Sequence, residues 1–408
     1  MAEGGTQTGT KYDVGGVLLE RPFKVRRLGH FGINIAQSAP MLDFYCETLG
    51  FRISDPLEAG KRPGEAAVSE PIGYFTRHGT DHHSFVLINT EVAKAAGRKD
   101  ENLPGVTVNQ MTWQVGTLAE VGGAIDWLTA GKVKMHRAGR DMPGSNWHCY
   151  FYDPEGHRNE LYYGMEQVGW TGASKPKPMH ERGFRERPPL PQMPEYQEVN
   201  DAMARGDDFG SGYRHPEKLP AKFDVGGVML PRPFKIVRHG PIHLFCRDVQ
   251  AMADFYRQKM GFAVSEEIQW QGHRCVFLRC GTEHTAMALY PIALRAQLGW
   301  SDKTTVMGFG LQVGSYRQLK DAVGWIRERG GKLLDAPPEL TPGIDYSVWV
   351  EDPSGHRVQI YYYMEQIGWD GKVRTERPRA STRPEDWPAA VTAQPDTYMG
   401  EPYLGPLG

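Results

Sequence analysis

The chain contains one long sequence pattern twice, and this repeat restricts its fold more than any other feature. Residues 11–26 read KYDVGGVLLERPFKVR, and residues 222–237 read KFDVGGVMLPRPFKIV. Later, DPEGHRNELYYGMEQVGWTG at 153–172 has its counterpart in DPSGHRVQIYYYMEQIGWDG at 352–371. Each copy is about 150 residues long, which is a usual domain size. We therefore predict two domains of one fold, joined end to end.

The composition between and around the copies predicts the remaining organisation. Pro and charged residues dominate the stretch that separates the copies, as in KPKPMHERGFRERPPLPQMPEYQ, and the C-terminal end has a similar character. Such composition is typical of linkers that cross a protein surface. We predict an N-terminal arm over 1–21, a first domain over 22–172, a linker over 173–221, a second domain over 222–372 and a C-terminal arm over 373–408.

Within one copy, strand-like and helix-like segments follow each other in a fixed order. HFGINIA alternates like a strand, APMLDFYCETLGF is helical and ends near a glycine, and GYFTR and SFVLIN are again strand-like. NQMTWQV, LAEVGGAIDWLTAG, WHCYFYD and NELYY then repeat that order. The pattern predicts an α+β fold of tandem βαβββ modules, two per domain, whose curved and mostly antiparallel sheets surround a pocket.

Composition and charge narrow the classes of partner. The formal net charge is -2, which argues against a nucleic-acid or anionic-membrane partner. No apolar run approaches the ~20 residues that span a bilayer, and the N-terminus lacks the apolar core of a secretory signal. The five cysteines show no CxxC spacing, which fits a reducing compartment. We expect a cytoplasmic protein with no membrane and no nucleic acid among its partners.

Several motifs of the first copy, taken in order, carry a family resemblance. GHFGINI is followed by DFYCETLGF, by DHHSFVLI and by NWHCYFYDPEGHRNELYYG. This series resembles the vicinal oxygen chelate superfamily, and it is most similar to the type I extradiol ring-cleavage dioxygenases. The fold implied by the resemblance covers both copies, whereas the motifs of a dioxygenase site fall only within 28–164.

The resemblance implies a role for each of six residues. Two imidazoles and one carboxylate would leave one face of a metal open, an arrangement that suits Fe(II). One ligand position that the family fills with His is Gln here, and an amide oxygen is a harder and weaker donor than imidazole. Glyoxalase I, in the same superfamily, can use Gln as a ligand, so Fe(II) or another divalent metal such as Mn or Zn remains expected. The implied metal ligands are His30, Gln110 and Glu160, the acid–base residue is His83, and the substrate-binding residues are His148 and Tyr152.

The second copy serves as an internal control for these positions. All six candidates change there, while the turn and core residues persist. The matching residues are Pro241, Gly308, Gln359, Thr285, Ser347 and Glu351. The alignment can slip by one near His284, but neither alignment leaves a facial triad. We therefore predict that the second copy is structural.

These observations lead to one main prediction and two alternatives. The main prediction is an extradiol-type dioxygenase that cleaves a catechol-like aromatic compound with dioxygen and works as a homo-oligomer. The first alternative is a glyoxalase- or epimerase-like isomerase or lyase, which would place a fourth ligand where Ser84 and Val86 stand. The second is a non-catalytic binding protein of the bleomycin-resistance kind.

Overall fold

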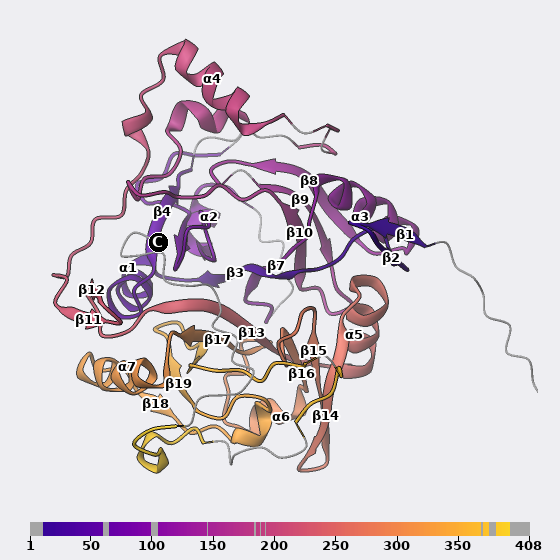
Figure 1. Cartoon of the computed structure of the whole chain (residues 1–408), viewed down its shortest axis with the longest axis vertical. Coiled ribbons are helices and arrows are strands. Elements are labelled where there is room, and N and C mark those ends of the chain that lie inside the picture. Colours follow the sequence, from indigo (N-terminus) through magenta and orange to yellow (C-terminus); the bar gives the residue numbers. More distant parts are fainter. Residues whose placement is uncertain are drawn as a thin grey trace, which may run out of the picture.

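The computed structural model describes residues 11–59, 65–98, 105–144, 146–182, 185–187, 189–191, 193–368, 370–374 and 381–391. Its first copy is built around one eight-stranded mixed sheet (Figure 1). The strands of this copy are β1 (Tyr12–Val14), β2 (Val17–Leu19), β3 (Arg27–Ile35), β4 (Arg52–Leu57), β5 (Gly73–Arg77), β6 (Phe85–Asn89), β7 (Val108–Gln114), β8 (Met135–Asp141), β9 (Asn146–Tyr152) and β10 (Arg158–Tyr163). Its helices are α1 (Ser38–Leu42), the π-helical turn η1 (Asp43–Thr48), α2 (Thr90–Ala95) and α3 (Leu118–Ala130).

The strand order of this sheet is β4-β5-β6-β3-β7-β10-β9-β8. Two βαβββ modules meet where β3 pairs antiparallel with β7, so the first strand of each module lies at the centre of the sheet. β3 also pairs parallel with β6, and β7 pairs parallel with β10. The centre of the sheet therefore receives side chains from β3, β7 and β10, which are far apart in the sequence.

The second copy repeats this architecture. Its strands are β11 (Phe223–Val225), β12 (Val228–Leu230), β13 (Ile236–Cys246), β14 (Ala263–Trp270), β15 (His273–Arg279), β16 (Met287–Pro291), β17 (Val306–Val313), β18 (Leu333–Leu334), β19 (Ser347–Glu351) and β20 (Arg357–Tyr361). Its helices are α5 (Val249–Phe255), η4 (Tyr256–Met260), α6 (Ala293–Gln297), α7 (Tyr316–Glu328) and the short turn η5 (Pro338–Leu340), while the turn η6 (Pro384–Asp386) lies in the predicted C-terminal arm. The order β14-β15-β16-β13-β17-β20-β19-β18 matches the first sheet strand by strand. The predicted α+β class with two modules per copy is confirmed.

Local sequence signals explain where the longer helices begin. Thr117 precedes α3, and its side chain accepts a hydrogen bond from the backbone N–H of Glu120 at 3.2 Å. Ser315 does the same for α7 through the N–H of Gln318. These are N-caps, which satisfy a backbone donor that the first helical turn leaves without a partner. The capped helices then place their buried faces against the sheets.

One hydrophobic core extends through both copies. Phe309 of the second copy lies with its ring centre 5.2 Å from those of Phe31 and Phe85 of the first. Buried hydrogen bonds also cross between the copies: Tyr45 donates to Asp352 at 2.8 Å and, in the matching position, Tyr256 donates to Asp153 at 3.0 Å. Each copy therefore completes the packing of the other, as the close contact of the two lobes in Figure 1 illustrates.

The predicted linker contains regular structure that the sequence did not suggest. It includes the turns η2 (Lys177–Arg182) and η3 (Phe209–Ser211) and the helix α4 (Glu195–Arg205), which lies at one end of the molecule (Figure 1). Arg140 of β8 forms a buried ion pair with Glu198 of α4 and so holds this helix against the first copy. Apolar periodicity did not predict α4, because this helix carries few apolar residues and is held by a distant ion pair.

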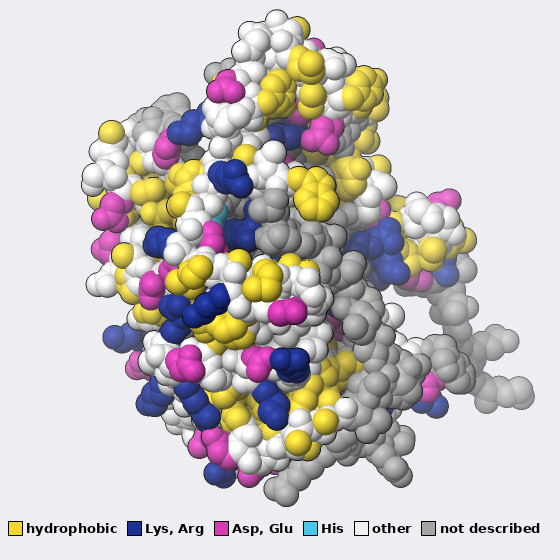
Figure 2. Space-filling view, turned by 60° about the vertical axis from the view of Figure 1, so that its left-hand side comes forward, with side chains coloured by type: hydrophobic (Ala, Val, Ile, Leu, Met, Phe, Trp, Pro, Cys, Tyr) yellow, Lys and Arg dark blue, Asp and Glu magenta, His cyan; other side chains and the backbone are white. Residues whose placement is uncertain are grey.

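The two predicted arms lie only partly within the described residues. The hairpin of β1 and β2 belongs to the predicted N-terminal arm, whereas residues 1–10 lie outside the described part of the chain, as do 375–380 and 392–408 of the C-terminal arm. None of the helices in the described ranges is long and apolar enough to cross a bilayer. On the face drawn in Figure 2, basic and acidic side chains are interspersed with hydrophobic and neutral ones.

Candidate metal and acid–base site

Two predicted site residues and the threonine between them lie in one row across the centre of the first sheet. His30 on β3 pairs across the sheet with Thr112 on β7, and Thr112 pairs in turn with Glu160 on β10. All three side chains are fully buried. The strand register therefore places His30 and Glu160, predicted as metal ligands, on the two sides of a threonine.

Glu160 is held by several donors at once. Its Oε2 lies 3.1 Å from His30 Nε2 and accepts a hydrogen bond from Thr112 Oγ1 at 2.8 Å, while its Oε1 accepts from Asn146 Nδ2 at 2.7 Å. Burial raises the pKa of Glu160, but His30, His148 and the Thr112 hydroxyl together lower it by more than burial raises it. The net pKa of this carboxyl is therefore below the ordinary value. The side chain is thus a fixed, ionised carboxylate inside the sheet.

Gln110 lies two residues before Thr112 on β7 and pairs with Gly32 instead of His30. Its Oε1 accepts a hydrogen bond from the Tyr150 hydroxyl at 3.4 Å, a long contact. The Tyr150 side chain, on β9, also interacts with Glu160. Burial and then the charge of Glu160 raise the pKa of this tyrosine. Gln110 therefore borders the His30–Glu160 pair, with the Tyr150 hydroxyl between them.

His83 is oriented by a short chain of hydrogen bonds. Its Nδ1 lies 2.9 Å from Nδ1 of His82, and Nε2 of His82 lies 2.9 Å from the Asp55 carboxylate on β4. When His82 is neutral and donates Nε2–H to Asp55, its Nδ1 accepts from Nδ1–H of His83. The Nε2 atom of His83 then carries the lone pair, which is the form that a general base needs.

The His83 ring packs directly against the predicted metal ligand. Its ring centre is 4.3 Å from that of His30 and 4.7 Å from that of Phe75. Burial lowers the pKa of His83 well below the ordinary histidine value, and His30 and His82 lower it further. The imidazole is therefore neutral near pH 7.

His148 has both ring nitrogens engaged by protein groups. Arg137 Nη1 lies 2.6 Å from Nε2 of His148, and Nδ1 of His148 lies 3.1 Å from the backbone oxygen of Asn146. Burial lowers the pKa of His148 by more than the negative charges of Asp141 and Glu160 raise it. In the neutral form, Nε2 accepts from the arginine and Nδ1–H donates to the carbonyl oxygen. This histidine connects a guanidinium to the residue that holds Glu160.

Tyr152 lies at the outer end of β9, away from the His30–Glu160 pair. It is half-buried, with Lys134 Nζ 4.7 Å from its ring centre and the His136 ring centre at 5.8 Å. Tyr150, two residues earlier on the same face of β9, is the tyrosine that contacts Gln110. The structure therefore brings His30, Gln110, Glu160, His83 and His148 together and places Tyr152 at the edge.

Sequence reasoning missed the residues that support this site. Asn146 and Tyr150 share a face of β9 with the predicted His148, and Thr112 shares a face of β7 with the predicted Gln110, because every second side chain of a strand points to the same face. That period of two was available in the sequence as a signal. Arg137 and Asp55 come from other strands, and only the pairing of strands brings them to the site.

The donor set can be compared with the needs of a metal ion. Two neighbouring ligands bound at about 2.1 Å and at right angles lie about 3.0 Å apart, close to the 3.1 Å between His30 Nε2 and Glu160 Oε2. Thr112 and Asn146 orient the carboxylate as outer partners of a ligand do. Among the described residues, no group of three His, Cys, Asp or Glu side chains is arranged to hold a metal ion. The pair fits a divalent metal, and the third protein donor would be the amide oxygen of Gln110.

The second copy has no equivalent arrangement in its described part. Pro241 follows a cis peptide bond at the position of His30, and a side chain on Gly310, opposite it, would approach the Gly240 oxygen to 2.4 Å. Gln359, at the position of Glu160, donates to Ser347 at 2.9 Å. The hydrogen bonds of His284 to Thr285 and to Glu266 repeat those of His82, so the alignment near His284 is the one without a slip.

Comparison with known proteins places these features in context. The sequence model described as Glyoxalase/Bleomycin resistance protein/Dioxygenase superfamily matches residues 27–161 and 238–360. Metapyrocatechase 2 of Cupriavidus necator is 31% identical over 134 residues, which make up 32% of this chain and 34% of that protein. The match thus spans about a third of the length of this curated relative.

Solved structures resemble the chain over most of its length. Homoprotocatechuate 2,3-dioxygenase from Arthrobacter globiformis gives a TM-score of 0.53 at 17% identity, covering 89% of this chain and 86% of that one. The Mn(II)-bound glyoxalase from Novosphingobium aromaticivorans gives a TM-score of 0.51 at 14% identity, and the match covers 85% of each chain. A halotolerant catechol dioxygenase gives a TM-score of 0.51 at 16% identity, and the match covers 88% of this chain and 92% of that one. At such identities these likenesses concern the fold.

Proposed function

Because the chain belongs to the glyoxalase/bleomycin resistance protein/dioxygenase superfamily, we propose that it is a metal-dependent dioxygenase of the extradiol type, which cleaves the ring of a catechol-like aromatic compound with dioxygen. The family membership confirms the resemblance seen in the sequence. The observation that carries the proposal is the buried His30–Glu160 pair with the neutral His83 packed against it. The names of the metapyrocatechase relative and of the dioxygenase neighbours support the same reaction class.

The proposed metal site consists of His30, Glu160 and Gln110. Gln110 would exchange its long hydrogen bond to Tyr150 for the metal, and its amide oxygen keeps the ligand set at one negative charge. When bound, a divalent metal such as Fe(II) would hold the substrate oxygens and dioxygen in one place and supply the redox chemistry. We expect weaker binding than by two histidines, because an amide oxygen is the poorer donor to iron.

The protein groups around this site would manage protons and orientation. His83 Nε2 would accept a proton from a catechol hydroxyl and later return it, while His82 and Asp55 keep the ring in the tautomer with Nε2 unprotonated. The His148–Arg137 contact places positive charge near the substrate anion and favours it over the neutral catechol. Tyr152 would contact a substrate group at the outer end of β9.

The first experiment measures metal content after anaerobic purification. We expect near one iron per chain in the wild type and its loss in His30→Ala and Gln110→Ala. Gln359→Leu is the matched control, because Gln359 occupies the position of Glu160 in the second copy. Iron lost in His30→Ala alone would remove Gln110 from the ligand set, and a wild type that holds no metal after reconstitution would overturn the dioxygenase proposal.

The second experiment tests the reaction. Iron-loaded protein is incubated with a panel of catechols while oxygen uptake and the yellow ring-opened product are followed. We expect turnover that falls at least ~100-fold in His83→Ala, since general acid–base catalysis contributes 10²–10⁴-fold. Oxygen uptake with none of the catechols, in protein that carries iron, would refute ring cleavage.

One observation favours a second function, that of a binding protein. The described residues lack a three-residue His, Cys, Asp or Glu set, and both nitrogens of His148 are bonded to protein groups. A metal-free protein that still binds small aromatic compounds at the His30–Glu160 site would support this alternative. The glyoxalase-like alternative would instead require divalent metal together with turnover that consumes no oxygen.

A further inference from the structure

The two strands that carry Glu160 and Thr112 are tied together on the back of the first sheet. Glu160 on β10 and Thr112 on β7 point to one face of this sheet. Their sequence neighbours Asn159 and Trp113 therefore point to the opposite face, because side chains alternate along a strand. The indole Nε1 of Trp113 donates to Oδ1 of Asn159 at 2.9 Å, and both side chains are fully buried. This hydrogen bond joins β7 to β10 directly behind the candidate site.

A tyrosine of the second copy extends this contact. Tyr256, the first residue of η4, accepts a hydrogen bond from Nδ2 of Asn159 at 3.1 Å and donates one to Oδ2 of Asp153 at 3.0 Å. The Asp153 carboxylate also accepts from the backbone N–H of His157 at 2.9 Å, which fixes it in the turn before β10. From Trp113 to Asp153, each hydrogen bond of the series therefore has a matching donor and acceptor.

The other half of the molecule provides a comparison for this arrangement. Tyr45 of η1 is the counterpart of the tyrosine in η4, and it donates to Asp352 at 2.8 Å. Apolar side chains stand there in place of the amide on β10 and the indole on β7, namely Val358 and Leu311. Of the two described sheets, only the one with the candidate ligands is therefore joined to the tyrosine of the other copy in this way.

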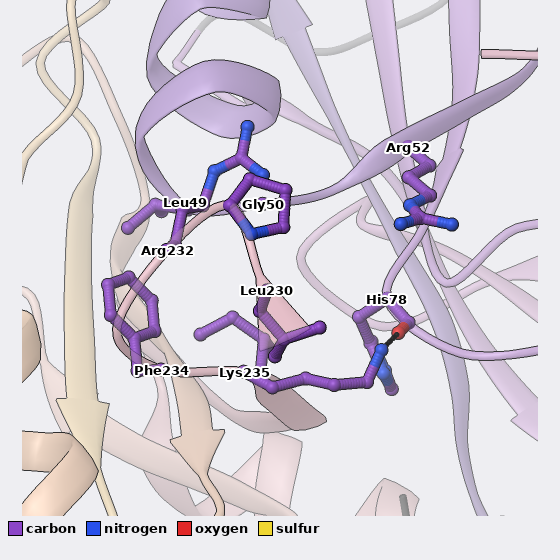
Figure 3. Close-up of a pocket in the computed structure, with 10 residues that line it drawn as sticks. Leu49, Gly50, Arg52, His78, Leu230, Arg232, Phe234 and Lys235 are labelled. Carbon is purple, nitrogen blue, oxygen red and sulfur yellow. Dashed lines mark hydrogen bonds between the residues drawn. The ribbon is translucent and has the colours of Figure 1, made fainter. Parts of the chain in front are cut away.

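The two turns that carry these tyrosines are otherwise anchored alike. Arg232 of the second copy donates to backbone oxygens of η1, and it lines the pocket drawn in Figure 3 together with Gly50, which follows η1. Arg21 is its counterpart in the first copy, and it donates to the backbone oxygen of Gly261, just after η4, at 3.4 Å. The hydrogen bonds of Asn159 are thus what distinguishes the half with the candidate site.

We propose that Tyr256 is a positioning residue for the candidate metal site, and that the second copy in this way sets how tightly the first copy holds its metal. The tyrosine acts through Asn159, which immediately precedes Glu160 on β10 and is bonded to β7 by the indole. Closely packed interiors transmit small shifts, so a displaced Asn159 moves the carboxylate relative to the donors on β7. This inference rests on the metal site proposed above, and it gives the second copy a role besides packing.

The test compares Tyr256→Phe with Tyr45→Phe in the full chain. Each variant removes one buried hydroxyl from the contact between the copies, so both should be less stable in urea. Metal-free protein is titrated with Mn(II), and the EPR signal of free Mn(II) measures binding to the folded protein. We expect Tyr256→Phe to weaken binding about fivefold, less than the ~10–100-fold lost with a partner that contacts the ligand itself. Tyr45→Phe, the matched control, keeps the wild-type affinity.

Asn159→Val tests whether the tyrosine acts through the amide, since valine stands at the matching position of the second copy. If it does, adding Tyr256→Phe to Asn159→Val weakens binding no further, because the contact is already lost. The EPR spectrum of bound Mn(II) should change in the same way in both single variants. In Tyr45→Phe this spectrum should stay as in the wild type.

Three results would overturn the proposal alone: wild-type Mn(II) affinity in Tyr256→Phe, an equal loss of affinity in Tyr45→Phe, or losses that add up in the double variant. A wild type that binds neither Mn(II) nor Fe(II) overturns the metal site itself, and the role of Tyr256 with it. Should Tyr256→Phe fail to fold, Asn159→Val takes its place beside Tyr45→Phe. Wild-type affinity in Asn159→Val then overturns the proposal.

Discussion

Replacement of Thr112 by valine tests whether the threonine between the two predicted ligands orients the carboxylate. Thr112→Val keeps the shape of the side chain and removes the hydroxyl that donates to Glu160 Oε2 at 2.8 Å, in a fully buried environment. Hydrogen bonds to charged groups contribute about 1.5–3 kcal/mol. Because Glu160 retains its contacts with His30 and Asn146, we expect a loss of about 2 kcal/mol in the free energy of unfolding.

The same substitution should weaken metal binding. Removal of an outer partner of a ligand usually lowers metal affinity by about 10–100-fold. Urea unfolding of the metal-free protein measures the loss in the free energy of unfolding. Titration with Fe(II) or Mn(II) under anaerobic conditions measures the affinity for the metal. Both values are needed, because a fold defect alone would lower stability and leave the affinity of the folded fraction unchanged.

Thr76→Val is the matched control for this experiment. Thr76 is equally buried in the same sheet, and its hydroxyl donates at 2.8 Å to a neutral acceptor, the backbone oxygen of Phe85. We expect it to cost about 1 kcal/mol and to leave metal affinity unchanged. Our reasoning would be refuted if Thr112→Val cost no more than Thr76→Val and bound metal as tightly as the wild type.

Three further predictions concern the copy interface, the buried Lys235 and the third ligand. Tyr45→Phe should cost about 1–3 kcal/mol in urea unfolding, because it leaves buried Asp352 without its tyrosine donor, and unchanged stability would contradict this. Burial lowers the pKa of Lys235 to about 7, so above pH 7 the unfolded chain binds more protons than the folded chain. Between pH 8 and 10 the free energy of unfolding should therefore rise by about 1 kcal/mol per pH unit relative to Lys235→Met, and a constant difference between the two proteins would refute this. Gln110→His should raise the affinity for Fe(II) at least about tenfold, and an unchanged titration would show that this side chain does not reach the metal.

Much of the fold was predictable from local patterns. The repeat indicated two copies, and strand alternation and helix caps indicated the order of elements within each, which the two matching sheets confirm. Helix α4 was not predicted, because its position depends on the Arg140–Glu198 ion pair with a distant strand. The predicted domain limits remain predictions.

The candidate site was predictable to the extent that motifs on single strands reveal it. His30, His83, His148 and Glu160 stand in such motifs, and the structure places them close together. The neighbours that decide their chemistry were not predictable in the same way. Asp55, for example, reaches His82 from β4 only because β4, β5 and β6 pair in a particular register. The roles assigned to all these residues remain predictions.

The sequence by itself determined the duplicated α+β fold and the loss of candidate ligands from the second copy, because repeats and period-two patterns are properties of neighbouring residues. The tertiary structure alone decided that Thr112, and not Gln110, stands opposite His30. It also decided that Arg52 and Lys235, far apart in the sequence, line one pocket. Strand register and copy packing depend on contacts between distant segments, and a shift of one residue would turn each side chain to the other face of the sheet.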